Sequence, residues 1–280
     1  MRARRRGARR APAATIRSQV TLPLRLGGGP ATTARVFTFD GLVDGREHLA
    51  IGLGDRALPV APSRTTPPLV RLHSECLTGD VLGSERCDCG PQLAEAVARI
   101  DAEGGYLLYL RQEGRGIGLY AKLDAYLLQD SGLDTYDANV ALGYPADERD
   151  YTVAAQMLAA LGVGRVALLG NNPDKGNQLK QLGILVTERV PTRVHLNAAN
   201  ARYLATKADK GGHTLDLTAP NVSAPRRPIG RSPADNGPVE VPDAPDRQRR
   251  RVAHRMQVVA AGRAARRSGA IGSPQDSQRP

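Results

Sequence analysis

The segment LVRLHSECLTGDVLGSERCDCGPQLAEAVARIDAEGGYLLYL (69–110) predicts a strand, a helix and a second strand in succession. Residues 69–73 have strand composition, and Pro91 stands at a position typical of the first turn of a helix. We expect this helix to end at Gly104 and a buried strand to follow at 106–110. This order is typical of a layered fold in which helices connect strands.

The alternation of strands and helices continues along the chain. The expected elements are, in order, a helix across 123–128, a helix at 147–162, a strand at 165–170, a helix within 171–183 and a strand at 184–190. This pattern predicts an α/β fold, a layered α/β/α domain with a mostly parallel or mixed sheet. A ligand cleft is then expected beyond the carboxyl ends of the strands.

The basic charge of the chain lies at its two ends. The formal net charge is +11, which would suit a nucleic-acid binder. However, residues 1–20 carry seven arginines and no acidic residue, and residues 216–280 carry twelve arginines against six acidic residues. The C-terminal segment has nine prolines and no aromatic residue, so it cannot bury enough apolar surface to fold alone. We therefore expect disordered basic tails at 1–17 and 216–280 and one folded domain at 18–215.

All three cysteines of the chain, Cys76, Cys87 and Cys89, lie in one loop. Three cysteines cannot all pair, no apolar run has transmembrane length, and no secretory signal is recognisable, so we expect a cytoplasmic protein that does not bind membranes. Cys87 and Cys89 would point to the same side of an extended segment, and the intervening loop can return Cys76 to them. The set resembles a three-thiolate zinc site with one position left for water. A fourth ligand at His73 and three inert buried thiols are the alternatives.

Five segments together, in this order, point to one enzyme family. They are VRLHSECLTGDVLGSERCDCGPQL (70–93), RQEGRGIGL (111–119), ADERDYT (146–152), NNPDK (171–175) and YLATKADKGGHTL (203–215). This set closely resembles GTP cyclohydrolase II, the enzyme that opens riboflavin biosynthesis. The resemblance implies a monofunctional, homodimeric hydrolase that converts GTP to 2,5-diamino-6-(5-phosphoribosylamino)pyrimidin-4(3H)-one, formate and pyrophosphate.

The resemblance also implies the catalytic groups. Cys76, Cys87 and Cys89 would hold one zinc ion per chain, because opening the imidazole ring of guanine requires activated water. Tyr126 corresponds to a position beside the reacting ring, and the alternative is a core tyrosine next to Leu123.

Two residues of the ADERD segment correspond to further catalytic groups. Asp147 would be the proton acceptor and Arg149 the nucleophile that displaces pyrophosphate. A guanidinium group is a poor nucleophile, although its planar shape suits stabilisation of phosphoryl charge. Asp147 could instead cap the helix that is expected at 147–162.

The nucleotide is expected to contact three of the five segments, together with Thr135 and Gly170. Glu113 suits guanine, because a carboxylate accepts hydrogen bonds from N1–H and from the 2-amino group. Lys175 is expected where a strand gives way to a helix, a favourable place for anionic groups. Magnesium is expected on the substrate phosphates. The substrate-binding residues that the resemblance implies are Arg71, Leu72, His73, Ser74, Glu75, Gln92, Glu113, Gly114, Arg115, Thr135, Gly170 and Lys175.

Some observations leave other interpretations open. Gly170 stands where the family typically has a threonine that touches the phosphates, so a paralogous cyclohydrolase of a specialised pathway with a different product is one alternative. Arg71 and Gln92 could be surface residues, and Thr135 could belong to a turn. A zinc-containing nucleic-acid-binding protein is the weakest alternative, because the domain between the tails is slightly acidic. Nucleic acid is expected to bind only non-specifically, through the tails.

Overall fold

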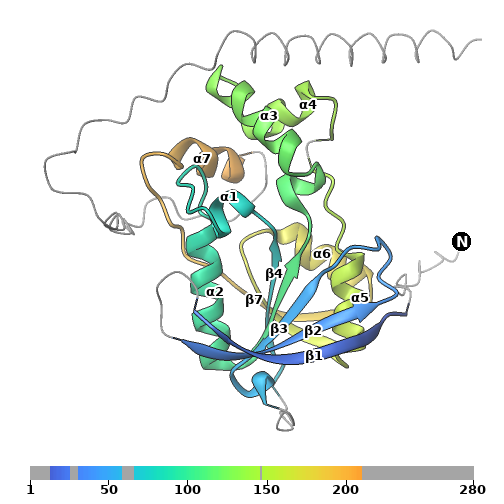
Figure 1. Ribbon diagram of the computed structural model, residues 1–280. Helices are drawn as coiled ribbons and strands as arrows, with labels where there is room; N and C mark the ends of the chain where they lie inside the picture. Colours follow the sequence, from blue (N-terminus) through green and yellow to red (C-terminus); the bar gives the residue numbers. More distant parts are fainter. Residues whose placement is uncertain (1–12, 26–30, 59–65, 146, 210–280) are drawn as a thin grey trace, which may run out of the picture. The chain divides into compact units, whose positions relative to one another are not determined.

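The computed structural model describes residues 13–25, 31–58, 66–145 and 147–209 (Figure 1). Most of the predicted N-terminal tail and all of the C-terminal tail lie outside these ranges. The described chain forms two compact units, the first up to Leu119 and again from Arg149, the second from Tyr120 to Glu148. Among the described helices, none combines the length and the apolar character that crossing a bilayer requires.

The first unit is built on a mixed sheet whose seven described strands have the order β1-β2-β3-β5-β4-β6-β7. The central pair β4 and β5 is parallel, as are the pairs β4–β6 and β6–β7. The pairs β1–β2, β2–β3 and β3–β5 are antiparallel. The strands are β1 (Thr15–Leu24), β2 (Thr32–Asp40), β3 (Leu49–Leu53), β4 (Leu69–Ser74), β5 (Gly105–Leu110), β6 (Arg165–Leu169) and β7 (Leu185–Val190).

Helices cover both faces of this sheet. On one face, α2 packs through Leu93, Val97 and Ile100. On the other face, α5 and α6 contribute Met157 and Leu179 to a second apolar cluster. The helices and 3-10 turns of this unit are η1 (Gly54–Ala57), α1 (Leu77–Asp80), α2 (Cys89–Glu103), η2 (Glu113–Gly116), α5 (Thr152–Ala160), α6 (Pro173–Gln181) and α7 (Ala201–Asp209). The predicted α/β/α layering and mixed sheet are confirmed.

The N-terminal strands β1, β2 and β3 were not predicted. Nine of the ten residues of β1 are exposed, so the strand lacks the apolar run that marks a buried strand. It is held at the edge of the sheet by its pairing with β2, from Thr15 opposite Asp40 to Leu24 opposite Thr32. Its first residues therefore belong to the sheet, although the sequence suggested a tail as far as residue 17.

Two helix starts differ from the prediction. The helix expected from residue 147 begins at Thr152, with Tyr151 in the capping position, so the interpretation of Asp147 as its cap is wrong. The helix expected to open at Pro91 begins at Cys89. Cys87 and Cys89 therefore do not share an extended segment, because the chain turns into α2 between them.

The second unit contains α3 (Leu119–Asp130) and α4 (Thr135–Ala141). The Asp134 side chain caps α4 by accepting hydrogen bonds from the backbone N–H groups of Tyr136 and Asp137. Apolar side chains of the two helices, including Ala125, Leu128 and Ala138, form a small cluster. The predicted helix across 123–128 is confirmed.

Candidate active site

The candidate site lies at the carboxyl ends of the parallel strands. Cys76 follows β4, Glu113 follows β5 and Gly170 follows β6. Because parallel strands end at the same edge of a sheet, the topology brings these three loops to one side of the molecule.

The alternation of side chains along β4 separates polar from apolar groups. Leu72 is completely buried in the cluster shared with α5 and α6. Arg71 and His73 point to the opposite face, where Arg71 contacts Gln92 of α2. The Leu72 side chain therefore has no access to a ligand, and its backbone oxygen accepts a hydrogen bond from Lys175 Nζ at 2.7 Å.

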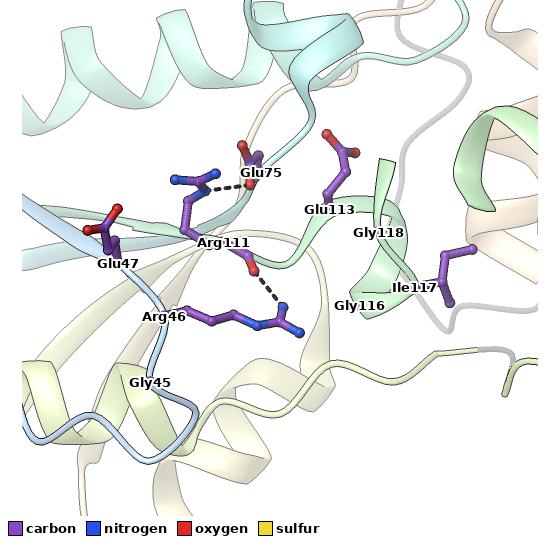
Figure 2. Close-up of a pocket in the computed structure, with 9 residues that line it drawn as sticks. All are labelled: Gly45, Arg46, Glu47, Glu75, Arg111, Glu113, Gly116, Ile117 and Gly118. Atoms are coloured by element: carbon purple, nitrogen blue, oxygen red, sulfur yellow. Dashed lines mark hydrogen bonds and ion pairs between the residues drawn. The ribbon is translucent and has the colours of Figure 1, made fainter. Parts of the chain in front are cut away.

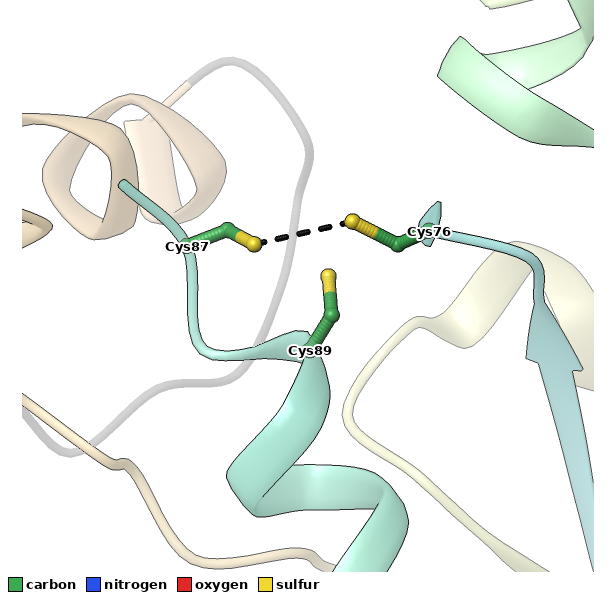
Figure 3. A group of neighbouring side chains, drawn as sticks. All are labelled: Cys76, Cys87 and Cys89. Carbon is green, nitrogen blue, oxygen red and sulfur yellow. Dashed lines mark hydrogen bonds between the residues drawn. The ribbon is translucent and has the colours of Figure 1, made fainter. Parts of the chain in front are cut away.

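The three thiols converge at the start of α2 (Figure 3). Their sulfur atoms all lie within 4.8 Å of one another, and Cys76 Sγ and Cys87 Sγ are 3.7 Å apart, too far for a disulfide bond. Tetrahedral zinc with Zn–S bonds of about 2.3 Å places its sulfur ligands about 3.8 Å apart. A Cβ atom at Gly79 would lie only 2.8 Å from Cys87 Sγ, so glycine leaves room for the cluster. The three cysteines thus fit a zinc ion.

The thiols affect one another's protonation. The hydrogen bond with Cys76 is the largest cause that raises the pKa of Cys87 to about 12. A hydrogen bond with Cys76 is also the largest cause that raises the pKa of Cys89 well above its usual range. Since only thiolates coordinate metals, an incoming ion must displace these protons, and its binding is coupled to pH.

A buried carboxylate contacts the backbone of the first cysteine. Asp80 Oδ2 accepts hydrogen bonds from Cys76 N–H at 3.0 Å and from the Tyr109 hydroxyl at 2.9 Å. His73 Nε2 lies 3.0 Å from the same oxygen, and its ring stacks on Tyr109. Burial is the main cause that lowers the pKa of His73. The cluster of convergent metal-ligand atoms in the described residues does not include His73, which instead contacts Asp80.

A second carboxylate connects the other two cysteines to Arg71. Asp88, between Cys87 and Cys89, accepts a hydrogen bond from Gln92 Nε2 at 2.5 Å. Gln92 Oε1 accepts in turn from Arg71 Nη2 at 2.7 Å. Arg71 and Gln92 are both buried, so the alternative that they are surface residues is wrong. Burial lowers the pKa of Arg71, and nearby acidic groups, Asp88 first among them, partly offset this effect.

The loop after β6 brings a glycine and a lysine to the same region. Gly170 has a φ of +155°, and a Cβ atom there would lie 2.9 Å from Arg71 Nη1. Lys175 is buried in the first turn of α6, as predicted, and its ammonium group lies 5.6 Å from the centre of the Tyr151 ring.

The turn after β5 is bound to the metal loop. Glu113 accepts hydrogen bonds from Leu77 N–H at 2.7 Å and from Gly114 N–H at 3.0 Å. Gly114 and Arg115 both have left-handed backbones, with φ of 62° and 63°. Arg115 is the one non-glycine residue of the described chain with a positive φ, a conformation that costs free energy and is common at functional sites.

A cavity of 470 Å³ opens beside this turn (Figure 2). Arg111 on its wall pairs with Glu75 at 2.8 Å, and Arg46 donates to the Arg111 backbone oxygen at 2.8 Å. Glu47 and Glu113 also line it. Ser74, the neighbour of Glu75, contacts Gln112 and does not line the cavity.

Three of the expected site residues belong to the second unit. Tyr126 is partly exposed on α3, with Lys122 Nζ 5.8 Å from its ring centre, and Leu123 is 42% exposed. The alternative of a core tyrosine packed on Leu123 is therefore wrong. Thr135 is the first residue of α4 and so does not belong to a turn, and Asp147 is exposed. Arg149 belongs to the first unit and is half-buried.

Sequence reasoning missed three residues near the thiols. Asp80 lies four residues after Cys76, and Tyr109 lies directly opposite His73 in the β4–β5 register. Burial is the main cause that raises the pKa of Tyr203 on α7 well above its usual range, and groups of the cysteine loop are among the smaller causes. The spacing of Asp80 from Cys76 was readable as one helical turn. The other two positions depend on strand register and on the docking of α7.

Comparison with known proteins agrees with this geometry. The family model for GTP cyclohydrolase II matches residues 17–191. This chain belongs to the GTP cyclohydrolase II family. A relative named GTP cyclohydrolase-2 from Psychromonas ingrahamii is 47% identical over 200 residues, which is 71% of this chain and 96% of the relative. The GTP cyclohydrolase-2 of Neisseria meningitidis serogroup A is 53% identical over 183 residues, 64% of this chain and 90% of the relative.

Longer relatives also contain the matched region. The riboflavin biosynthesis protein RibBA of Bacillus subtilis is 51% identical over 197 residues, which is 70% of this chain and 47% of that protein. The family thus agrees with the resemblance that the five sequence motifs carry, and it makes this protein a member of a family of riboflavin-pathway hydrolases.

Proposed function

We propose that this protein hydrolyses GTP to 2,5-diamino-6-(5-phosphoribosylamino)pyrimidin-4(3H)-one, formate and pyrophosphate, as the first step of riboflavin biosynthesis. The observation that carries the proposal is the three-thiol cluster beside buried Arg71, in a chain of this family. We assign the activity to the domain expected at 18–215, together with the start of β1 at Thr15, acting as a cytoplasmic homodimer. A reducing compartment suits its three free thiols.

Cys76, Cys87 and Cys89 would hold one zinc ion per chain. When bound, zinc supplies Lewis-acid activation of water for hydrolysis of the imidazole ring and of the formyl group. Asp80 bonds to the backbone of Cys76, and Asp88, between the other two cysteines, bonds to Gln92, so that both arms of the cysteine loop are held.

The nucleotide would be held by groups of different charge. Arg71 and Lys175 are buried cations suited to the phosphates, with magnesium as a further counter-ion. The cavity beside Glu113 carries carboxylates and guanidinium groups together, which suits the hydrogen-bonding edge of guanine better than a triphosphate. His73, Ser74, Glu75, Gln92, Gly114, Arg115, Thr135 and Gly170 complete the proposed contacts, Leu72 through its backbone alone.

Three residues are proposed to act directly in the reaction. Tyr126 would lie beside the reacting ring, and Asp147 would accept a proton. Arg149 would act at the α-phosphate, where its guanidinium group suits stabilising charge as pyrophosphate leaves.

The test is to incubate the purified protein with GTP, zinc and magnesium and to follow formate, pyrophosphate and pyrimidine absorbance separately. Equal amounts of formate and pyrophosphate, together with the diaminopyrimidine, are expected. Ring opening without formate release would instead identify a cyclohydrolase with a different product. Absence of any turnover of GTP would contradict the proposal.

A further inference from the structure

The backbone of Cys76 is held on both sides by a single residue. Asp80 N–H donates to the Cys76 carbonyl at 2.7 Å, and Asp80 Oδ2 accepts from Cys76 N–H at 3.0 Å. Just before this point, Glu75 N–H donates to the Leu110 carbonyl at 2.8 Å, so the chain is fixed by the sheet up to Glu75. Asp80 fixes the backbone for one residue more, at Cys76, which carries the first thiol.

The Asp80 carboxylate is itself held in place. Its side chain is 2% exposed, and a buried carboxylate is costly unless several hydrogen bonds stabilise it. Besides Cys76 N–H, it accepts from the Tyr109 hydroxyl at 2.9 Å and contacts His73 Nε2 at 3.0 Å. Tyr109 and His73 come from neighbouring strands and stack with an interplanar angle of 16°, so both partners are rigid.

The direction of a thiol follows from the orientation of its backbone. Fixing both peptide groups of Cys76 fixes its Cα–Cβ bond and leaves only rotation about that bond for the sulfur atom. Cys76 Sγ then stays 3.7 Å from Cys87 Sγ, the spacing that a tetrahedral ion needs. Outer partners that orient metal ligands typically contribute ten- to a hundredfold in metal affinity.

We propose that Asp80 is a positioning residue of the metal centre, which orients Cys76 for zinc through its backbone and is held in turn by Tyr109 and His73. This inference rests on the zinc site of the proposed function, but not on the reaction with GTP. Zinc binding is therefore measured without nucleotide, so that a failure to hydrolyse GTP leaves this test intact.

The main variant is Asp80→Ala, which removes the oxygen that accepts from Cys76 N–H and from the Tyr109 hydroxyl. Its zinc dissociation constant, measured by competition with a chromophoric chelator, is expected to rise about ten- to a hundredfold. Tyr109→Phe removes one of the bonds that hold Asp80 and should raise the constant about three- to tenfold. Glu85→Gln is the matched control, since this exposed carboxylate lies in the same loop, and it should leave zinc affinity unchanged.

A second measurement separates positioning from general stability. Each variant is unfolded by urea with zinc and with excess chelator, and the gain in stability due to zinc is compared. Substitution of a positioning residue reduces that gain. Substitution of a residue that only stabilises the fold lowers the free energy of unfolding equally with zinc and with chelator. If Asp80→Ala does not fold without zinc, Tyr109→Phe decides by the same comparison. An unchanged zinc constant in the folded variants, with stability lost equally in both conditions, overturns the proposal.

Discussion

The two faces of β4 carry equally buried side chains of opposite chemistry. On the face that contacts α5 and α6, Val70 and Leu72 are completely buried in an apolar cluster. On the face that contacts α2, Arg71 and His73 are 6% and 3% exposed and depend on a chain of polar partners. The difference shows that burial alone does not distinguish a core from a site.

The polar face is stabilised only by specific partners. Burial lowers the pKa of both Arg71 and His73, which means that the charged form of each is disfavoured there. Arg71 and His73 are costly to bury and lie on the side of the sheet that carries the three thiols. Their burial there indicates a binding site. The apolar face, by contrast, gains free energy from every contact. Substitutions on the two faces should therefore separate activity from stability.

The largest expected effect on activity is that of Cys87→Ser, at one of the thiols beside the polar face. Removing one of three thiolates should abolish zinc binding and lower formate release by at least about a hundredfold. The measurements are metal content by elemental analysis and separate assays of formate and pyrophosphate. If zinc serves ring hydrolysis alone, pyrophosphate release continues without formate, and loss of both shows that zinc organises the whole site. Full formate release by zinc-free protein would refute the assignment.

On the apolar face, Leu72→Ala should mainly affect stability. A buried leucine truncated to alanine typically costs about 2–5 kcal/mol in the free energy of unfolding, because a cavity remains. Urea unfolding measures this loss, with Val81→Ala as a control at a position that is 68% exposed. Below the unfolding transition, KM for GTP should stay unchanged. A large rise in KM would mean that the Leu72 side chain contacts the nucleotide after all.

The strands that could be predicted are those marked by a local pattern of apolar residues in the sequence. The strands at 69–73, 106–110, 165–170 and 184–190 are apolar runs between turn signals, and all four are confirmed. The exposed strand β1 has no such run and exists because β2 pairs with it. Local pattern therefore predicts the four strands that run parallel to one another and not the antiparallel strands β1, β2 and β3.

The same limit applies to the site. The convergence of Cys76, Cys87 and Cys89 was predicted, but from an extended segment, whereas a turn into α2 brings the thiols together. The partners Asp80 and Tyr109 were missed, because strand register places Tyr109 beside His73, where its hydroxyl reaches Asp80. Motifs therefore predicted which side chains form the cluster, and three-dimensional packing determines what holds them.

Gly170 gives a smaller and more specific test of the polar face. The family threonine at this position suggests that Gly170→Thr would improve the handling of GTP. The structure reverses that expectation, because φ is +155° and the new Cβ would lie 2.9 Å from Arg71 Nη1. Displacing a buried guanidinium group should lower kcat/KM for GTP about tenfold.

The control for this substitution is Gly162→Thr. Gly162 also has a positive φ, of +72°, but a Cβ atom there would meet no atom within 4 Å. It therefore measures the effect of backbone strain without a clash. Steady-state kinetics of both variants decide the question. Equal effects would show that Arg71 is not displaced, and faster turnover by Gly170→Thr would restore the phosphate contact that the family suggests.

The smallest expected effect concerns a polar cluster that joins α2 to the segment around His195. Glu95 on α2 accepts hydrogen bonds from His195 Nε2 at 2.9 Å and from Arg193 N–H at 3.1 Å. Burial raises the pKa of Glu95, but these bonds outweigh it and lower the pKa overall. The carboxylate therefore stabilises the folded chain above its ordinary pKa of about 4.5, and this contribution is lost as pH falls through the lowered value.

Glu95→Gln should reduce the free energy of unfolding by about 1 kcal/mol at pH 7, because the amide keeps only part of the hydrogen bonding. The gap between parent and variant should close only as pH falls through the lowered pKa of Glu95, where the parent carboxylate becomes protonated as well. Glu103→Gln, on the same helix but 54% exposed, should change stability by less than about 0.5 kcal/mol at any pH. Zinc affinity should be the same in all three proteins, because the hydrogen bonds of Glu95 run to Arg193 and His195 rather than to the cysteine loop. A fall in the zinc affinity of Glu95→Gln would instead make Glu95 part of the polar face. A difference in stability between parent and variant that persists at low pH would show that the charge of Glu95 does not hold the segment around His195.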